Sequence, residues 1–248
     1  MSELVTVVTG GSRGIGAATA RRLAAAGHAV VIGYRQDQAA AASVAAAIGD
    51  LGGRCVCAQA DTVREGDVAR LFEAAASLGR VTGLVNNAGV TGPLGRLVEQ
   101  PPQELRRVVE VNVVGYLLCA QFAARAMSRS LGGSGGAIVN VSSAAATLGS
   151  PGEYVHYAAS KAAVDAMTVG LSKELGPEGI RVNGVAPGTI YTDIHAAAGD
   201  ADRPDRIGAT TPMGRSGQPE EVAAAIAWLL GPEASYTSGT VLRVAGGR

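Results

Sequence analysis

Short apolar runs alternate with helical stretches along the whole chain, and this alternation limits the possible folds more than any other feature. The strands expected from the apolar runs are 4–9, 29–34, 54–59, 84–86, 137–142, 181–185 and 241–244. The helices expected between them are 15–26, 37–51, 63–78, 103–131, 155–175 and 219–230. Continuous apolar strands separated by helices are typical of a parallel sheet that is covered on both faces. The pattern therefore predicts an α/β fold with a doubly wound parallel sheet of about seven strands.

The composition and charge fit one globular unit. Hydrophobic residues make up 47% of the 248 residues and charged residues 17%, which is enough for a sizeable core. No linker or change of composition divides the chain, so residues 1–248 are predicted to form a single domain. The formal net charge is +0, and nothing suggests binding to nucleic acid or to a membrane surface. The apolar stretch 108–127 contains Glu110, Asn112, Gln121 and Arg125, which predicts a buried helix and not a membrane span.

Two further features predict a cytoplasmic protein. The N-terminal residues Met1–Leu4 contain no basic segment, so we expect no signal peptide. The cysteines are Cys55, Cys57 and Cys119, and adjacent thiols on one face of a strand, such as Cys55 and Cys57, seldom have disulfide geometry. No second cluster of cysteine and histidine accompanies them, so we expect reduced thiols and no metal site.

Tyr157 and Lys161 stand four residues apart on an expected helix and therefore share one face of it. A neighbouring ammonium favours the phenolate and lowers the pKa of a tyrosine, which lets the tyrosine act as a general acid or base. Ser143 follows the expected strand 137–142, where its hydroxyl could bond a substrate oxygen. A tyrosine and a lysine at this spacing are common by chance, and on their own they would indicate only a surface pair.

The turn after the first strand is rich in glycine and reads Thr9-Gly10-Gly11-Ser12-Arg13-Gly14-Ile15-Gly16. Glycines there allow a tight turn and let a pyrophosphate approach the backbone at the positive end of a helix. Its position between a strand and a helix is the context that a dinucleotide fingerprint requires. No Gly-Lys-Ser/Thr sequence follows, which argues against a nucleoside-triphosphate loop.

The end of the second strand predicts the choice of cofactor. NAD-dependent enzymes usually carry a carboxylate there, which bonds the ribose hydroxyls. Here the strand ends in Tyr34 and Arg35, and the first carboxylate is Asp37. Arg35 offers a planar, permanently charged group that suits a 2′-phosphate, and Arg13 could reach the same phosphate. The sequence thus favours NADP(H), the alternative being that both arginines are solvated surface residues.

Together these features resemble the classical short-chain dehydrogenase/reductase family, and the resemblance extends from Thr9 to Gly247. Its motifs are the glycine turn, Asn86-Asn87-Ala88-Gly89, Asn112, Ser143 and the Tyr157–Lys161 pair. The resemblance implies a Rossmann-type fold and an NADP(H)-dependent oxidoreductase that moves a hydride between nicotinamide and a carbonyl or secondary alcohol. The nearest relatives would be 3-oxoacyl-thioester reductases or glucose-dehydrogenase-like enzymes. The family also implies a homotetramer built around helices 103–131 and 155–175 and the C-terminal segment. Its partner would be a small-molecule carbonyl or alcohol substrate.

The resemblance assigns a role to each matching residue. Tyr157 would be the general acid/base, Lys161 would bind the nicotinamide ribose and lower the pKa of the tyrosine, Ser143 would polarise the substrate carbonyl, and Asn112 would anchor a water. Asp61 would bond the adenine, and Pro187 and Gly188 would face the nicotinamide carboxamide. Residues 86–89, which begin with Asn86, would line the cofactor at the end of the fourth strand. The full set of residues implied to bind the cofactor is Gly10, Ser12, Arg13, Gly14, Ile15, Gly16, Tyr34, Arg35, Asp61, Thr62, Asn87, Ala88, Gly89, Tyr157, Lys161, Pro187, Gly188, Ile190 and Thr192.

The interval from Ser143 to Tyr157 is one position longer than is usual in the family. We interpret this as an insertion in the loop 148–156, which keeps Ser143 and leaves Ser142 as the alternative. Tyr154, in the same loop, could compete with Tyr157, but the residue four places after it is Ala158, which has no amine.

Other functions remain open at this point. Within enzymes the alternative is an NAD-preferring sugar or polyol dehydrogenase. A redox sensor that binds NADP(H) without turnover usually lacks the tyrosine or the lysine, and a methyltransferase would have no use for the pair. The substrate would be selected by segments 91–98, 144–156 and 190–217, the last of which is expected to be a lid with a short helix or two.

Overall fold

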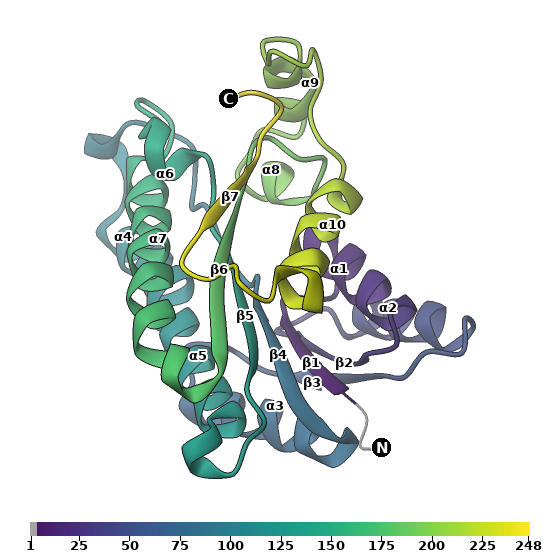
Figure 1. The fold of residues 1–248 in the computed structure, drawn as a ribbon. Coiled ribbons are helices and arrows are strands. Elements are labelled where there is room, and N and C mark those ends of the chain that lie inside the picture. Colours follow the sequence, from purple (N-terminus) through teal and green to yellow (C-terminus); the bar gives the residue numbers. More distant parts are fainter. Residues whose placement is uncertain (1–3) are drawn as a thin grey trace.

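The computed structural model describes residues 4–248 and contains one sheet of seven parallel strands in the order β3-β2-β1-β4-β5-β6-β7 (Figure 1). The strands are β1 (Leu4–Thr9), β2 (Ala29–Tyr34), β3 (Cys55–Gln59), β4 (Arg80–Asn86), β5 (Gly136–Val141), β6 (Ile180–Pro187) and β7 (Val241–Val244). The chain runs outward from β1 to β3 and then returns to build β4 to β7 on the other side of β1. The loops after β1 and β4 diverge at this reversal and open a crevice at the carboxyl ends of the strands. The predicted doubly wound α/β fold is confirmed.

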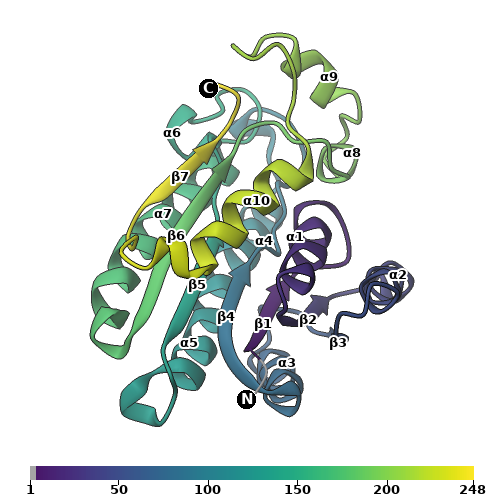
Figure 2. The same cartoon turned by 45° about the vertical axis from the view of Figure 1, so that its right-hand side comes forward.

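Helices cover both faces of the sheet (Figure 2). They are α1 (Gly14–Ala25), α2 (Gln38–Gly49), α3 (Glu65–Leu78), α4 (Pro102–Val109), α5 (Gly115–Met127), α6 (Ala145–Leu148), α7 (Val155–Leu175), α8 (Ile194–Ala197), α9 (Arg203–Gly208) and α10 (Pro219–Leu230). Helices α1, α2 and α10 pack on one face, and α3, α5 and α7 pack on the other. Both faces of the central strands are therefore buried, which is why β1 and β2 are mostly apolar, with Thr6 and Thr9 of β1 as buried polar residues.

Strand β4 begins at Arg80 and not at residue 84 as predicted. Thr82 and Gly83 interrupt the apolar sequence of this strand, so the sequence pattern predicted only its second half. The glycine is required by packing, because a Cβ at Gly83 would lie 2.4 Å from Oγ1 of Thr6 on the neighbouring strand. The pairing between β1 and β4 also shifts its register at this point.

The predicted long helix 103–131 is divided. Helix α4 passes into a π-helical turn, Glu110–Val114, which is followed by α5 and a 3-10 turn, Arg129–Leu131. The stretch Pro102–Met127 is long and apolar enough to cross a membrane by length and composition, a criterion that core helices also meet. Here 44% of its most apolar part is buried, and Cys119, Ala123 and Met127 of α5 pack into the core beneath the sheet.

The connecting segments hold more structure than the sequence indicated. The expected lid, residues 190–217, contains the two short helices α8 and α9 and is closed at its base by a parallel bridge between Ile190 and Gly217. Helix α6 was not predicted, and it forms part of the longer loop that separates Ser143 from α7. Residues 1–3, on which the expectation about a signal peptide depends, lie outside the described residues.

Candidate active site

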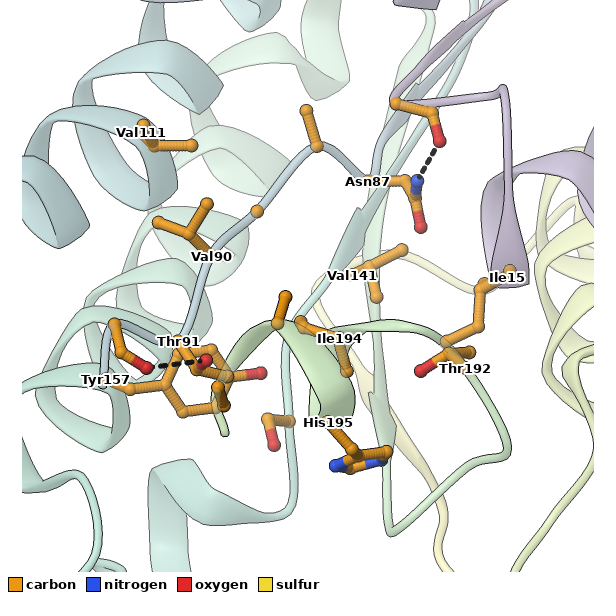
Figure 3. Close-up of a pocket in the computed structure, with 18 of the residues that line it drawn as sticks. Ile15, Asn87, Val90, Thr91, Val111, Val141, Tyr157, Thr192, Ile194 and His195 are labelled. Carbon is orange, nitrogen blue, oxygen red and sulfur yellow. Dashed lines mark hydrogen bonds between the residues drawn. The ribbon is translucent and has the colours of Figure 1, made fainter. Parts of the chain in front are cut away.

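A cavity of about 1170 Å³ runs along the carboxyl ends of the strands. Its walls are the turns after strands β1 to β6, the start of α7 and the lid. Figure 3 shows Tyr157 on one side of it, Ile15, Asn87 and Thr192 on the other, and His195 of α8 between them. Nearly all the predicted site residues line this cavity, namely Gly10, Ser12, Arg13, Gly14, Ile15, Tyr34, Arg35, Asp61, Thr62, Asn87, Ala88, Gly89, Ser143, Tyr157, Lys161, Pro187, Gly188, Ile190 and Thr192.

The glycine turn after β1 depends on glycine in two ways. Gly10 and Gly14 have φ angles of 63° and 52°, a region that residues with a side chain rarely adopt. Gly16 does not face the cavity, but a Cβ there would lie 2.3 Å from the carbonyl oxygen of Gly10. The turn therefore presses against the start of α1, whose first turn carries no acidic residue. Free backbone N–H groups and the helix dipole make this end of α1 suitable for a phosphate group.

Asn87 joins the end of β4 to the glycine turn. Its Nδ2 donates to the carbonyl oxygens of Thr9 at 2.9 Å and Gly10 at 3.0 Å. Figure 3 draws one hydrogen bond from this nitrogen. In return, the backbone N–H groups of Asn87 and Ala88 donate to Oγ1 of Thr9 at 2.9 and 3.0 Å. These bonds fix the two loops that diverge at the reversal of the strand order.

Asn86 does not line the cavity, so the prediction for this residue is wrong. Side chains alternate along a strand, and that of Asn86 points into the protein. There its Nδ2 donates to Oδ1 of Asn140 at 3.0 Å and to the carbonyl oxygen of Tyr116 at 3.1 Å. Asn86 thus links β4 to β5 and α5.

The side chain of Asn112 also lies behind the cavity wall. It is fully buried in the π-helical turn, where Oδ1 accepts from the N–H of Val90 and Nδ2 donates to the Val90 carbonyl at 2.8 Å and to Ser160 at 3.0 Å. These contacts clamp the loop after β4 against α7. The predicted role in holding a water stays a prediction.

Ser143 and Tyr157 face each other across the cavity wall. A hydrogen bond from the Ser143 hydroxyl lowers the pKa of Tyr157, but burial outweighs it and raises that pKa to about 12. Ser142 is buried and turned away, and its hydroxyl donates to the Lys161 carbonyl at 3.3 Å. Of the two serines considered from the sequence, Ser143 is the one placed beside the tyrosine.

Lys161 is almost completely buried below Tyr157. Its Nζ donates to the Val141 carbonyl at 2.7 Å and to the Tyr116 hydroxyl at 3.1 Å, and it lies 5.8 Å from the centre of the Tyr157 ring. Burial lowers the pKa of Lys161 to about 7, so much of its charge is absent at neutral pH. The expectation that Lys161 lowers the pKa of Tyr157 is therefore not met in this structure, because desolvation dominates both groups.

Tyr154 packs beside Tyr157 in an edge-to-face contact, with ring centres 5.3 Å apart. The guanidinium of Arg203, from α9, lies over the Tyr154 ring, 5.1 Å from the ring centre. Neither Arg203 nor its partner Glu153 was predicted as a site residue, because the two residues are 50 positions apart and no motif connects them. Tyr116 was missed for a similar reason, since it meets Lys161 only through the packing of α5 against α7.

The nucleotide end of the cavity holds the remaining predicted residues. Arg35 is exposed at the end of β2, and no hydrogen bond or ion pair engages its side chain within residues 4–248. Asp37 instead caps α2 by accepting from the N–H of Ala40 at 2.9 Å, and lies 3.5 Å from Arg13. At the base of the lid, Thr192 packs closely against the glycine turn. A Cβ atom added to Gly14 would lie only 3.0 Å from Cγ2 of Thr192.

Comparison with known proteins places the chain in a family. A family model described as enoyl-(acyl carrier protein) reductase matches residues 10–248. An uncharacterized oxidoreductase of Escherichia coli, YgfF, is 48% identical over 98% of this chain and 99% of its own length. The 3-oxoacyl-[acyl-carrier-protein] reductase of a Synechocystis species is 38% identical over 100% of this chain and 97% of its own.

Solved structures agree. A dehydrogenase/reductase from Sinorhizobium meliloti superposes with a TM-score of 0.91 and 34% identity, covering 100% of this chain and 95% of that one. A short-chain dehydrogenase from Burkholderia cenocepacia, solved in complex with NADP, gives a TM-score of 0.88 and 38% identity over 98% of this chain and 96% of its own. The protein is thus a member of the short-chain dehydrogenase/reductase family of oxidoreductases.

Proposed function

We propose that the protein is an NADP(H)-dependent oxidoreductase that interconverts a carbonyl group and a secondary alcohol, with Tyr157 as the acid/base. The observation that carries this proposal is the placement of the Ser143 and Tyr157 hydroxyls together on the wall of a cavity that also contains the glycine turn. Bound NADPH would supply the hydride, or bound NADP⁺ would accept it. The protein would supply the proton and hold the reacting oxygen.

In the direction of reduction, Tyr157 would donate its proton to the substrate oxygen. Because burial raises its pKa to about 12, the hydroxyl keeps its proton at neutral pH and is ready to act as the acid. Ser143 accepts a hydrogen bond from the N–H of Ala145 at 3.1 Å, and its own O–H, which bonds Tyr157 in this structure, would turn to the substrate oxygen and polarise it. Lys161 would hold this cluster together through its bonds to the Tyr116 hydroxyl and the Val141 carbonyl.

The end of β2 favours NADP(H) over NAD(H). The glycine turn fits a dinucleotide phosphate, and the exposed guanidinium groups of Arg13 and Arg35 line the same end of the cavity. The first carboxylate after the strand, Asp37, is engaged in capping α2 and in a loose pair with Arg13. The Burkholderia cenocepacia relative was solved with NADP, which supports the same assignment.

The substrate end favours a carbonyl compound that is uncharged near the reacting carbon. Four of the charged residues that line the cavity neutralise each other in the pairs Glu153–Arg203 and Glu104–Arg107. A 3-oxoacyl thioester fits this description, and one relative is a 3-oxoacyl-[acyl-carrier-protein] reductase. A sugar or polyol, as in a glucose-dehydrogenase-like enzyme, is the second candidate.

A screen of NADPH oxidation with ketones, 3-oxoacyl thioesters and aldoses, run beside NADH, tests the proposal. We expect turnover of at least one class with NADPH preferred. Tight binding of NADPH with no turnover of any class would instead indicate a redox sensor.

Oxidation and reduction should respond differently to pH. Reduction uses the protonated hydroxyl of Tyr157, which persists at every pH well below its pKa of about 12, so its rate should stay level through the neutral range. Oxidation uses the phenolate, whose fraction rises as pH approaches that pKa, so its rate should still be climbing at pH ~10, the ordinary tyrosine value. Profiles of kcat/KM in both directions check this. An oxidative plateau near neutral pH would show that the tyrosine pKa is lowered in the working enzyme.

We also expect the chain to form a homotetramer through α4, α5 and α7. Exposed apolar side chains on these helices include Val109, Leu117 and Val169, which would be covered by such contacts. Light scattering at micromolar concentration should give four times the chain mass of 24.8 kDa. A single-chain mass would contradict this prediction.

A further inference from the structure

The lid, residues 190–217, is held to the opposite wall of the cavity by few contacts. Most of its polar contacts are internal, such as those of Tyr191 with Asp205 and of Ser216 with the Pro204 carbonyl. Within residues 4–248, the hydrogen bonds that cross the cavity are a long one, from the Leu94 N–H to the Ala198 carbonyl at 3.4 Å, and the bonds of Arg203. Closure of the lid therefore depends mainly on Arg203.

Arg203 and Glu153 form a two-pronged ion pair across the cavity. Both terminal nitrogens of Arg203 donate to the two carboxylate oxygens of Glu153, each at 2.7 Å. The side chain of Arg203 is 8% exposed and that of Glu153 is 34% exposed. This pair lowers the pKa of Glu153 and raises that of Arg203, so both stay ionised at neutral pH.

The third nitrogen of Arg203, Nε, is buried and meets no hydrogen-bond acceptor among the described residues 4–248. Burying an N–H group without an acceptor costs free energy, and this cost disfavours the closed position of the lid. The two bonds from Arg203 to Glu153 must offset that cost for the lid to stay closed. Loss of Glu153 would leave a buried guanidinium with no carboxylate, and the lid would be expected to swing away from the wall.

The guanidinium of Arg203 is connected to the proposed acid/base, Tyr157, by contacts through the ring of Tyr154. It lies 5.1 Å above the centre of Tyr154, and Tyr154 meets Tyr157 edge to face at 88°. Such cation–π and aromatic contacts restrict the rings that make them. The position of the Tyr157 ring thus depends in part on the position of α9.

We propose that Glu153 and Arg203 form a latch that closes the lid over the substrate, and that Arg203 is a positioning residue for Tyr157 through Tyr154. This rests on the proposed function, in which Tyr157 transfers the proton. The cofactor residues of the lid, Ile190 and Thr192, lie at its base near the glycine turn, so the latch should affect the substrate and not the cofactor.

Three variants separate the two roles of Arg203. Glu153→Gln weakens the latch by removing its negative charge but leaves Arg203 able to contact Tyr154 whenever the lid closes over substrate, so we expect KM for the carbonyl substrate to rise at least about fivefold with a small change in kcat. Arg203→Gln removes both contacts and should raise KM similarly and also lower kcat. The double variant should resemble Arg203→Gln, because the two residues act as one pair. The affinity for NADPH should stay unchanged in all three.

Arg206→Gln is the matched control, because Arg206 is an exposed arginine of the same helix that pairs with Asp200 inside the lid. It should keep the KM and kcat of the wild type. Hydrogen exchange in residues 190–217 supplies a readout that does not depend on turnover, and it should speed up in the latch variants and not in the control. If the wild type proves inactive, this measurement still decides the latch. Glu153→Gln is the milder of the two single variants. If its hydrogen exchange in residues 190–217 and its KM for the carbonyl substrate both equalled those of the wild type, the proposal would be overturned.

Discussion

Tyr157→Phe should reduce turnover by roughly 10²–10⁴-fold, the range that proton transfer by a positioned side chain usually contributes. The change removes only the hydroxyl that faces Ser143, and the ring keeps its edge-to-face contact with Tyr154. Folding and NADPH affinity should therefore survive. Steady-state rates together with a fluorescence titration of NADPH measure both quantities on the same preparation.

Tyr154→Phe is the comparison that decides which tyrosine transfers the proton. It also removes a hydroxyl from the cavity wall, but it leaves Tyr157 beside Ser143 and keeps the ring beneath Arg203. We expect a much smaller loss of turnover than in Tyr157→Phe. If Tyr154→Phe were the inactive variant, the one-residue insertion would have been placed on the wrong side of the tyrosines.

The fold could be predicted from the sequence because each element carries a local signal. Strands buried on both faces have largely apolar sequences, and several of the helices between them, such as α3, α7 and α10, are followed directly by glycine. The predictions failed where a local signal was masked by packing. Gly83 interrupts β4 because Thr6 leaves no room for a side chain, and the turn at Asn112 becomes π-helical within a sequence that looks uniformly helical.

The sequence also predicted most of the residues that line the cavity, but for a different reason than it predicted the fold. Its residues follow the ends of strands, and parallel topology brings those ends together, so short motifs far apart in the chain meet at one cavity. What could not be predicted was the direction of a pKa. The spacing of Tyr157 and Lys161 suggests that the ammonium lowers the pKa of the tyrosine, whereas burial, which the sequence does not report, raises one pKa and lowers the other. The Glu153–Arg203 pair escaped notice because only the folded lid brings those residues together.

The second large effect is expected at the nucleotide end of the cavity. Arg35→Asp should reduce the catalytic efficiency with NADPH by about ten- to a hundredfold, because a charge-assisted bond to the 2′-phosphate is lost and a carboxylate is placed near it. The same carboxylate stands where NAD-dependent enzymes bond the ribose hydroxyls, so the efficiency with NADH should rise. The ratio of kcat/KM for the two cofactors measures the switch.

Arg21→Asp provides the control for this change of charge. Arg21 is exposed on α1 and does not line the cavity, so its replacement alters the net charge equally without touching the cofactor. The ratio of NADPH to NADH efficiency should stay at the wild-type value in that variant. If Arg35→Asp also left the ratio unchanged, Arg13 would be the remaining cation at the end of β2 and the next residue to replace. A wild type that already prefers NADH would contradict the assignment of NADP(H), since an arginine in place of the carboxylate gives NAD no ribose partner at this strand end.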